Sequence, residues 1–377
     1  MAGIYIHIPF CKNKCYYCNF YSVASSKHAE EFISALLKET ELQKNYLESE
    51  TIGTIYFGGG TPSLMDYETL MKIFDKIYQT FEVSADAEIT LEANPDDLDK
   101  KKLGEIKALP VNRLSIGIQS FFEEDLKYLR RRHTASQAEA SVKRSQDAGF
   151  ENISIDLIYA IPTLTDGNWK TNLDIAFSLE VPHISSYGLT VEPSTALDML
   201  IRKGKLKGVD EEQNARQFKF LMQQMKTNGF IQYEISNFCK EGSISRHNSN
   251  YWKGRKYLGL GPSAHSFNID SRQWNKPDLL NYIASLAKGI VPFEKEILTT
   301  ADKFNEYVMT SLRTMWGCDL KFIEKTFGAD AASTMQKKAA KFIERNQMIL
   351  AEEILYLTDE GKLFADGIAS EMFLVEE

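Results

Sequence analysis

The chain has 377 residues, of which 43% are hydrophobic and 25% charged, and its net charge is −8. These values are ordinary for a globular protein with one large domain and a smaller one, and no apolar run approaches the roughly 18 residues that a membrane-spanning helix needs. The acidic balance argues against a protein that mainly contacts nucleic-acid backbones. Five cysteines without a disulfide framework and an amino terminus without a secretory signal predict a cytoplasmic location.

The first predicted element is a strand over residues 4–8, where side-chain types alternate and β-branched residues are frequent. Cys11, Cys15 and Cys18 follow on the next loop. Three thiolates in a C-x3-C-x2-C spacing suit a [4Fe-4S] cluster, whose fourth iron would stay open to bind a small molecule. The alternative is a zinc site completed by a fourth ligand such as His7.

Predicted strands and helices then alternate along the chain. The strands fall at residues 54–57, 87–92, 113–119, 153–159 and 183–189, and the clearest helices at 28–46, 66–79, 137–148 and 211–228. This alternation indicates parallel β/α units, which right-handed crossovers close into a barrel or part of one. We therefore predict an α/β fold with a partial barrel of about six strands.

Polar or small residues recur at the carboxyl ends of these strands. They are Cys11, residues 58–61, Glu92, Gln119 and Asp156. Each of them alone would be an ordinary strand-end or turn residue. Because the same edge of a parallel barrel carries the active site, their repetition predicts one shared site.

The sequence divides into three predicted parts: a barrel over residues 1–238, a connecting or lid segment over 239–297, and a smaller α+β domain over 298–377. In the last part, helices precede an apolar hairpin at residues 348–357, as in a winged-helix module. Such modules often bind DNA. Residues 301–377, however, hold 9 Lys and Arg against 14 Asp and Glu, a net charge of −5, which favours a packing or partner-docking role.

The cysteine loop resembles that of the radical S-adenosylmethionine (SAM) superfamily, including Tyr17 before the third cysteine. Residues 58–62, Gly-Gly-Gly-Thr-Pro, resemble the superfamily's glycine-rich element that receives the SAM amino group. Motifs at residues 5–11, 116–121 and 155–159 are similar to the oxygen-independent coproporphyrinogen III oxidase family. The resemblance implies a TIM-like partial (β/α)6 barrel, a [4Fe-4S] cluster, SAM in the barrel mouth, and an electron donor such as flavodoxin or ferredoxin.

Two departures separate the chain from the true oxidases of that family. Phe20 stands where the oxidases carry a further cysteine, and only ten residues precede Cys11, where the oxidases have an extension over the substrate. Residues 247–252, His-Asn-Ser-Asn-Tyr-Trp, resemble the H-N-x-x-Y-W signature of the HemW branch, the heme chaperones. The resemblance thus implies a protein that binds heme and delivers it to acceptor proteins, membrane-associated ones among them.

Two alternatives remain open at this point. One is an oxidase that decarboxylates coproporphyrinogen III propionates in porphyrin biosynthesis with SAM as oxidant, so the question of an enzymatic activity is open. The other is a zinc-bound regulatory or nucleic-acid module, although we expect no nucleic-acid partner.

The resemblance also implies roles for individual residues. Cys11, Cys15 and Cys18 bind the cluster. Glu92 and Gln119 can pair with SAM hydroxyls or its ammonium group, and Arg131 can bind the carboxylate. The expected SAM site comprises Tyr5, Tyr17, Gly59, Gly60, Thr61, Glu92, Gln119, Arg131, Asp156 and Gly188.

The expected heme ligand is His247, because imidazole is a common donor to heme iron. Tyr251 and Trp252 could stack on the porphyrin. His265, in a glycine-rich loop expected near the barrel mouth, is a second candidate. The alternative for His247 is a histidine that is hydrogen-bonded within the protein.

Overall fold

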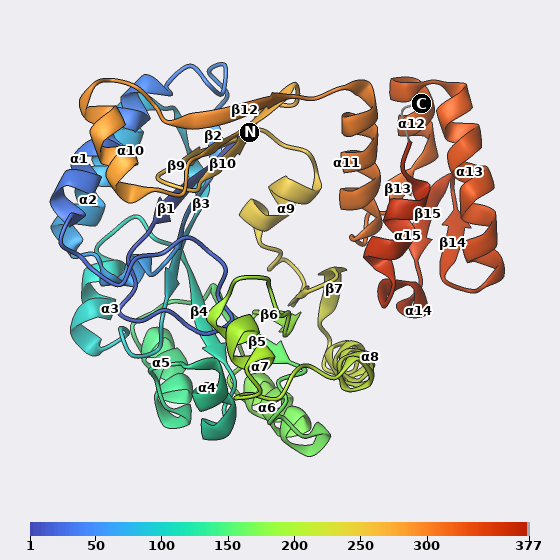
Figure 1. Cartoon of the computed structure of the whole chain (residues 1–377), viewed down its shortest axis with the longest axis horizontal. Helices are drawn as coiled ribbons and strands as arrows, with labels where there is room; N and C mark the ends of the chain where they lie inside the picture. The colour runs from blue at the N-terminus through green and yellow to red at the C-terminus, as the bar shows by residue number, and fades with distance from the viewer. Residues whose placement is uncertain (375–377) are drawn as a thin grey trace.

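The computed structural model describes residues 1–374, and its main feature is a sheet of parallel strands that alternate with helices (Figure 1). The first six strands pair in parallel in chain order: β1 (Ala2–Ile8), β2 (Ile52–Gly59), β3 (Val83–Ala93), β4 (Arg113–Gln119), β5 (Ile153–Tyr159) and β6 (His183–Gly188). The intervening and following helices are η1 (Pro62–Leu64), α1 (Ala29–Leu42), α2 (Tyr67–Thr80), α3 (Lys100–Lys107), α4 (Glu123–Leu129), α5 (Ala135–Asp147), α6 (Asp166–Ser178), α7 (Ala196–Arg202) and α8 (Glu211–Thr227). The prediction of about six parallel strands is confirmed.

The alternation of side chains in β1 explains how the sheet separates a core from a cavity. Ile4, Ile6 and Ile8 are fully buried in the hydrophobic core. Tyr5 and His7 lie on the opposite face, because successive side chains of a strand point to opposite sides. Tyr5 lines the cavity inside the barrel. One face of each strand thus stabilises the fold, and the other is available for a ligand.

Residues 239–297 do not form the predicted connecting or lid segment but extend the large sheet. They contain α9 (Arg246–Trp252), β9 (Tyr257–Leu260), β10 (His265–Phe267), β11 (Ser271–Asn275), α10 (Leu279–Ala287) and β12 (Phe293–Ile297). β9 pairs in parallel with β1, and β10 to β12 continue the sheet as antiparallel strands. Strands of three to five residues are too short to show a clear hydrophobic period, which is why the sequence did not reveal them.

The barrel is open rather than closed. Within residues 1–374 the strand order is β12-β11-β10-β9-β1-β2-β3-β4-β5-β6-β8-β7, so the sheet ends in two separate edges. At the second edge, β8 (Asn237–Cys239) and β7 (Ile231–Glu234) pair in antiparallel fashion beside β6. This is the partial barrel that the sequence predicted.

A smaller domain with its own hydrophobic core follows the barrel and lies beside it in Figure 1. Its elements are α11 (Thr300–Leu312), β13 (Cys318–Asp319), α12 (Leu320–Phe327), α13 (Ala329–Glu344), β14 (Met348–Ala351), β15 (Ile354–Leu357), α14 (Asp359–Lys362) and α15 (Ala365–Met372). The strands form a sheet in the order β13-β15-β14. Helices followed by a hairpin reproduce the predicted winged-helix-like order.

The two domains are joined by backbone hydrogen bonds at β7. The amide of Met315 donates to the Tyr233 carbonyl (3.0 Å), and the amide of Ile235 donates to the Arg313 carbonyl (3.1 Å). Arg313 also places its guanidinium 5.5 Å from the ring centre of Trp252 on α9. No helix in the described part of the chain is long and apolar enough to cross a membrane.

Candidate cluster and cofactor site

The three clustered cysteines lie on the loop after β1, and this loop is fixed at its base. The amide of Cys11 donates to the Val23 carbonyl (3.1 Å), and the amide of Val23 donates to the Pro9 carbonyl (2.7 Å). Farther along the loop, the amide of Tyr16 donates to the Leu129 carbonyl at the end of α4 (3.2 Å). All three cysteines line one small cavity of about 80 Å³.

Polar side chains from two other loops donate to the cysteine sulfurs. The Thr61 hydroxyl lies 3.6 Å from Cys11 Sγ, and Arg131 Nη1 lies 3.5 Å from Cys15 Sγ. Donors of this kind stabilise thiolates and tune iron–sulfur clusters. Burial nevertheless raises the pKa of Cys11 and raises that of Cys18 to about 11, so these hydrogen bonds offset only part of the cost of forming thiolates, and metal binding has to displace the thiol protons.

The geometry fits an iron–sulfur cluster better than zinc. His7 does not point to the cysteines, because its Nε2 bonds to the Tyr21 carbonyl (2.8 Å) and its Nδ1 to the Tyr5 hydroxyl (3.2 Å). Among residues 1–374, no three His, Cys, Asp or Glu side chains converge as a single metal ion requires. In a cluster, each cysteine binds a different iron atom, so the sulfurs need not converge on one point.

Beside the cysteine loop, the barrel mouth holds a cavity of about 510 Å³, a size typical of small-molecule sites. All ten residues of the expected SAM site line it, together with Cys18. They come from all six parallel strands, from the middle of β1 and β5 and from the ends of the other four, and from the connections between the strands. The structure thus brings together side chains that are up to 183 positions apart, from Tyr5 to Gly188.

Arg131 is the cationic group that joins this cavity to the cysteine loop. Its Nη2 donates to Asn94 Oδ1 (2.6 Å) and to the Gly117 carbonyl (2.7 Å). Its Nε is buried and has no partner in the described part of the chain. An unused buried donor on a guanidinium suits an anionic ligand group, such as the carboxylate of an amino acid.

A strand irregularity sets the position of Gln119. The register between β4 and β5 shifts between Gly117 and Gln119, and Gln119 adopts a left-handed backbone with φ of 70°. A bulge of this kind redirects a side chain and stores local strain, which clusters at functional sites. Here it accompanies a buried glutamine that lines the cavity.

The glycines after β2 are required by packing against β1. A Cβ at Gly60 would lie 2.6 Å from the Phe10 carbonyl oxygen, and one at Gly59, with φ of 105°, would lie 2.7 Å from the His7 ring. The glycine-rich run therefore lets the β2 end and the cysteine loop approach each other closely. Close approach to a ligand remains a prediction from the resemblance.

Two buried carboxyl groups give the cavity a preference for cations. Burial raises the pKa of Glu92 to about 7, although its Oε1 accepts a hydrogen bond from the Tyr56 hydroxyl (2.8 Å). Burial also raises the pKa of Asp156 to about 6. A positively charged ligand would offset the free-energy cost of ionising these carboxyl groups inside the protein, because it would pair with the carboxylates.

The first prediction follows from Glu92. SAM carries a sulfonium and an ammonium group, so its affinity should increase as pH rises through about 7, where Glu92 loses its proton. One pH unit below that value, we expect about tenfold weaker binding, since the protonated form dominates by that factor. Equilibrium dialysis of SAM against cluster-loaded protein between pH 5.5 and 8.5 measures this.

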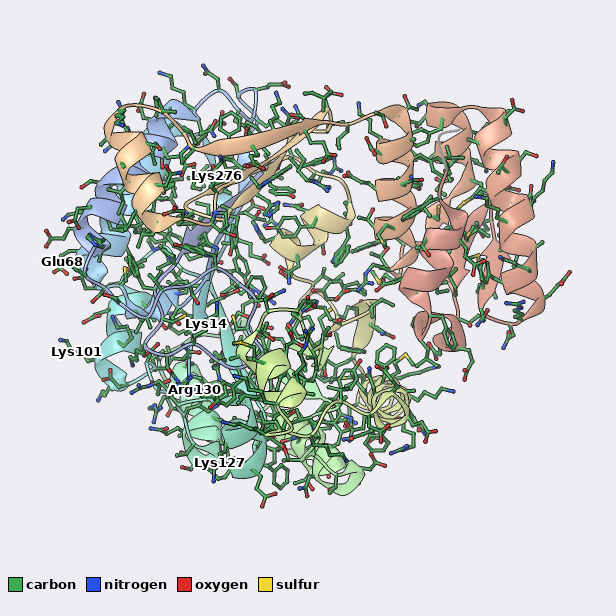
Figure 2. All side chains as sticks on the ribbon, viewed as in Figure 1. Lys14, Glu68, Lys101, Lys127, Arg130 and Lys276 are labelled. Carbon is green, nitrogen blue, oxygen red and sulfur yellow. The ribbon has the colours of Figure 1, made fainter. Side chains whose placement is uncertain are left out.

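Two variants make this measurement specific. Glu92→Gln should bind SAM weakly and with a flatter pH profile, while Glu68→Gln, on the exposed outer side of α2 (Figure 2), should keep the wild-type slope. An unchanged slope in Glu92→Gln would contradict the assignment.

Several cavity residues were not predicted from the sequence. Asn94 accepts from Arg131 and donates through Nδ2 to Thr61 Oγ1 (3.1 Å), so it links the arginine to the cysteine loop. The sequence could have indicated Asn94, because it lies two residues after Glu92 at the end of the same strand. Tyr56 stacks on Tyr5 with ring centres 6.1 Å apart and gave no such signal.

The structure does not present His247 to a ligand. The side chain is 1% exposed, its Nδ1 bonds to the Thr54 hydroxyl (2.8 Å), and its Nε2 bonds to the Tyr251 hydroxyl (2.9 Å). The backbone amide of His247 donates to Glu88 Oε1 (2.9 Å). This supports the alternative of a hydrogen-bonded structural histidine, and Trp252 correspondingly lies against Arg313 of the smaller domain.

A second prediction follows. His247→Ala should destabilise the protein by about 2–4 kcal/mol, since it leaves the Tyr251 hydroxyl without a partner, removes one of the two hydrogen bonds of the Thr54 hydroxyl, and creates a cavity. His28→Ala, at the half-buried start of α1, should change stability by less than about 0.5 kcal/mol. Urea unfolding measures both, and equal effects would contradict the structural role.

Comparisons with known proteins agree with this geometry. Residues 5–175 match the radical SAM superfamily, and residues 298–364 match the HemN C-terminal domain. The heme chaperone HemW of Bacillus subtilis is 34% identical over 371 residues, which cover 98% of each chain. The chain belongs to the HemW family of radical SAM proteins.

Other relatives support the same assignment. HemW of Lactococcus lactis is 32% identical, with 99% of this chain and 97% of the relative covered. Coproporphyrinogen III oxidase (HemN) from Escherichia coli shares the fold, with a TM-score of 0.85, 22% identity, and coverage of 99% of this chain and 90% of the other. Membership of the HemW family and the radical SAM superfamily implies a [4Fe-4S] cluster and SAM.

Proposed function

We propose that this chain is a heme chaperone that carries a [4Fe-4S] cluster, binds SAM in the barrel mouth, and delivers heme to acceptor proteins. The observation that carries the proposal is similarity to HemW proteins over the whole length of both chains, on a fold in which the cysteine loop faces the cavity. Phe20, 63% exposed at the rim of this cavity, stands where the oxidases carry their further cysteine.

The residues of the chain have separable tasks in this proposal. A bound cluster would supply an open iron and a source of electrons. Arg131 binds the SAM carboxylate through its unused Nε, and Glu92 and Asp156 pair with the cationic groups. Gln119 and Asn94 supply hydrogen bonds to the remaining polar groups.

The surface beside the cysteine loop suits a protein electron donor. Lys14 and Arg130 are exposed and line the small cavity of the cysteines (Figure 2). Both charges lie close to the cluster site, where an acidic donor such as flavodoxin or ferredoxin could dock. The heme acceptors are proposed to be proteins that reach the chaperone from the cytoplasm or from the membrane surface.

The test uses anaerobically reconstituted protein in two assays. In the first, hemin is titrated and then transferred to apomyoglobin as a generic acceptor. In the second, coproporphyrinogen III, SAM and reductant are added, and decarboxylated product is measured. We expect heme binding and transfer without decarboxylation; product formation without heme binding would replace the proposal by the oxidase.

A further inference from the structure

Building on the proposed function, we propose that heme is ligated by His265 on the inner face of the sheet beyond β9, beside Trp274. This assigns the cargo to a surface next to the SAM cavity, which the H-N-x-x-Y-W motif adjoins through Tyr251, whose ring centre lies 4.7 Å from that of Tyr257 on β9.

The environments of the histidines favour His265 among the six in the sequence. Four of them are no more than 2% exposed: His7, His133, His183 and His247. Apart from Nδ1 of His133, their ring nitrogens are hydrogen-bonded, as in His183, which bonds to Ser154 and Tyr233. His28 is half-buried at the start of α1 and lies 3.6 Å from Glu31. Only His265 is exposed, and its ring forms no hydrogen bond within residues 1–374.

The strand register places His265 on the cavity side of the sheet. Tyr5 on β1 lines the SAM cavity and pairs with Gly259 on β9. Tyr257, two residues earlier on β9, pairs with Phe267 on β10. Paired residues share a face of the sheet, and so do residues two apart in one strand. Tyr5, Gly259, Tyr257, Phe267 and His265 are linked in turn by these two relations, so His265 lies on the same inner face as Tyr5. Two strand spacings separate β10 from β1, a distance of about 10 Å.

The backbone of β10 lies closely over β9 beside His265. A Cβ at Gly259 would lie 2.1 Å from the His265 carbonyl oxygen, so only glycine fits at this position of β9. A ligand on His265 therefore meets no side chain from Gly259.

Trp274 holds the imidazole and adds an apolar surface. It is the direct partner of His265 on β11, and the two rings are nearly parallel, with an interplanar angle of 26° and centres 6.1 Å apart. Stacking of this kind restricts rotation of the imidazole. Phe267, two residues along β10, extends the aromatic surface on the same face.

The charges around Trp274 suit the two propionates of heme. Arg272 lies two residues before Trp274 on β11 and so shares its face, and Lys276 follows directly after the end of β11. Arg272 pairs with Glu306, and Lys276 lies 3.6 Å from Glu294 at the surface (Figure 2). The Lys276–Glu294 pair is exposed and therefore weak, so Lys276 can exchange its partner for a carboxylate ligand, whereas the Arg272–Glu306 pair is half-buried.

The experiment titrates hemin into cluster-loaded protein and follows the Soret band and the electron paramagnetic resonance of the iron. We expect His265→Ala to bind hemin at least tenfold more weakly and to lose the histidine-ligated spectrum. His265→Cys should give a thiolate-ligated spectrum, and Trp274→Ala should weaken binding without a change of ligand. His28→Ala serves as the matched control with wild-type behaviour.

The outcomes separate this inference from the proposed function. If wild-type protein binds heme and His265→Ala keeps its affinity and spectrum, the assignment to His265 is overturned and the chaperone function stands. If a folded His247→Ala variant loses the ligand spectrum instead, the assignment is also overturned. If wild-type protein binds no heme at all, the chaperone function itself fails.

Discussion

A Cys15→Ala variant should lose its iron–sulfur cluster, with iron falling from about four atoms to below one per chain after anaerobic reconstitution. Cys15 sits on a loop anchored to α4, and its sulfur accepts a hydrogen bond from Arg131. Because the SAM amino acid needs the open iron as well as the cavity, its affinity should fall by at least about tenfold, or 1.4 kcal/mol. Iron and sulfide analysis together with equilibrium dialysis measure both effects.

The matched control is Cys239→Ala. Cys239 on β8 is fully buried in the barrel core and does not line either cavity. This variant should lose some stability and keep its iron. Loss of the cluster in both variants would point to a general folding defect, and retention in Cys15→Ala would contradict the cluster site.

Arg131→Gln should weaken SAM binding by roughly ten- to a hundredfold while the cluster is retained. The guanidinium is half-buried between Asn94 and Gly117, and its free Nε would bind the carboxylate. Loss of a hydrogen bond to a charged group costs about 1.5–3 kcal/mol. Equilibrium dialysis of SAM is the measurement, with iron content as the internal reference.

The neighbouring arginines provide controls of equal chemistry. Arg130→Gln and Arg132→Gln remove exposed guanidinium groups from the same stretch of chain. Both should leave SAM affinity within about twofold, since surface charges contribute little. Equal losses in all three variants would indicate a general electrostatic effect, and the assignment of the carboxylate to Arg131 would then be wrong.

The central part of the fold was predictable because its strands and helices are long. β4 and β5 coincide with the predicted ranges, and Asp66, the first residue of the helix predicted at 66–79, caps α2 by accepting from the Thr69 amide (2.8 Å). The extension of the sheet by β9 to β12 was not predictable in this way. Its strands have only three to five residues, and a helix, α10, separates the last two of them.

The candidate site likewise has residues that the sequence could indicate and features that it could not. Predicted strand ends indicated Glu92 and Gln119, because a parallel barrel brings such residues to one edge. The prediction placed Asp156 at a strand end too, but it lies in the middle of β5 and reaches the same cavity from there. The sequence could not show the bulge that directs Gln119, or the two hydrogen bonds that bury His247. A sequence motif shows which residues act together. The environment of each side chain depends on contacts with distant strands, such as the hydrogen bond between His247 and Thr54 on β2.

The outermost strand β12 has a consequence for access to the molecule. All five of its residues are exposed, and its centre reads Glu294-Lys295-Glu296. Charged residues in the middle of an unpaired edge discourage another strand from adding to the sheet. Within residues 1–374 no further strand pairs with β12, and we expect a planar molecule to approach His265 from this side of the sheet while nucleotide fills the mouth.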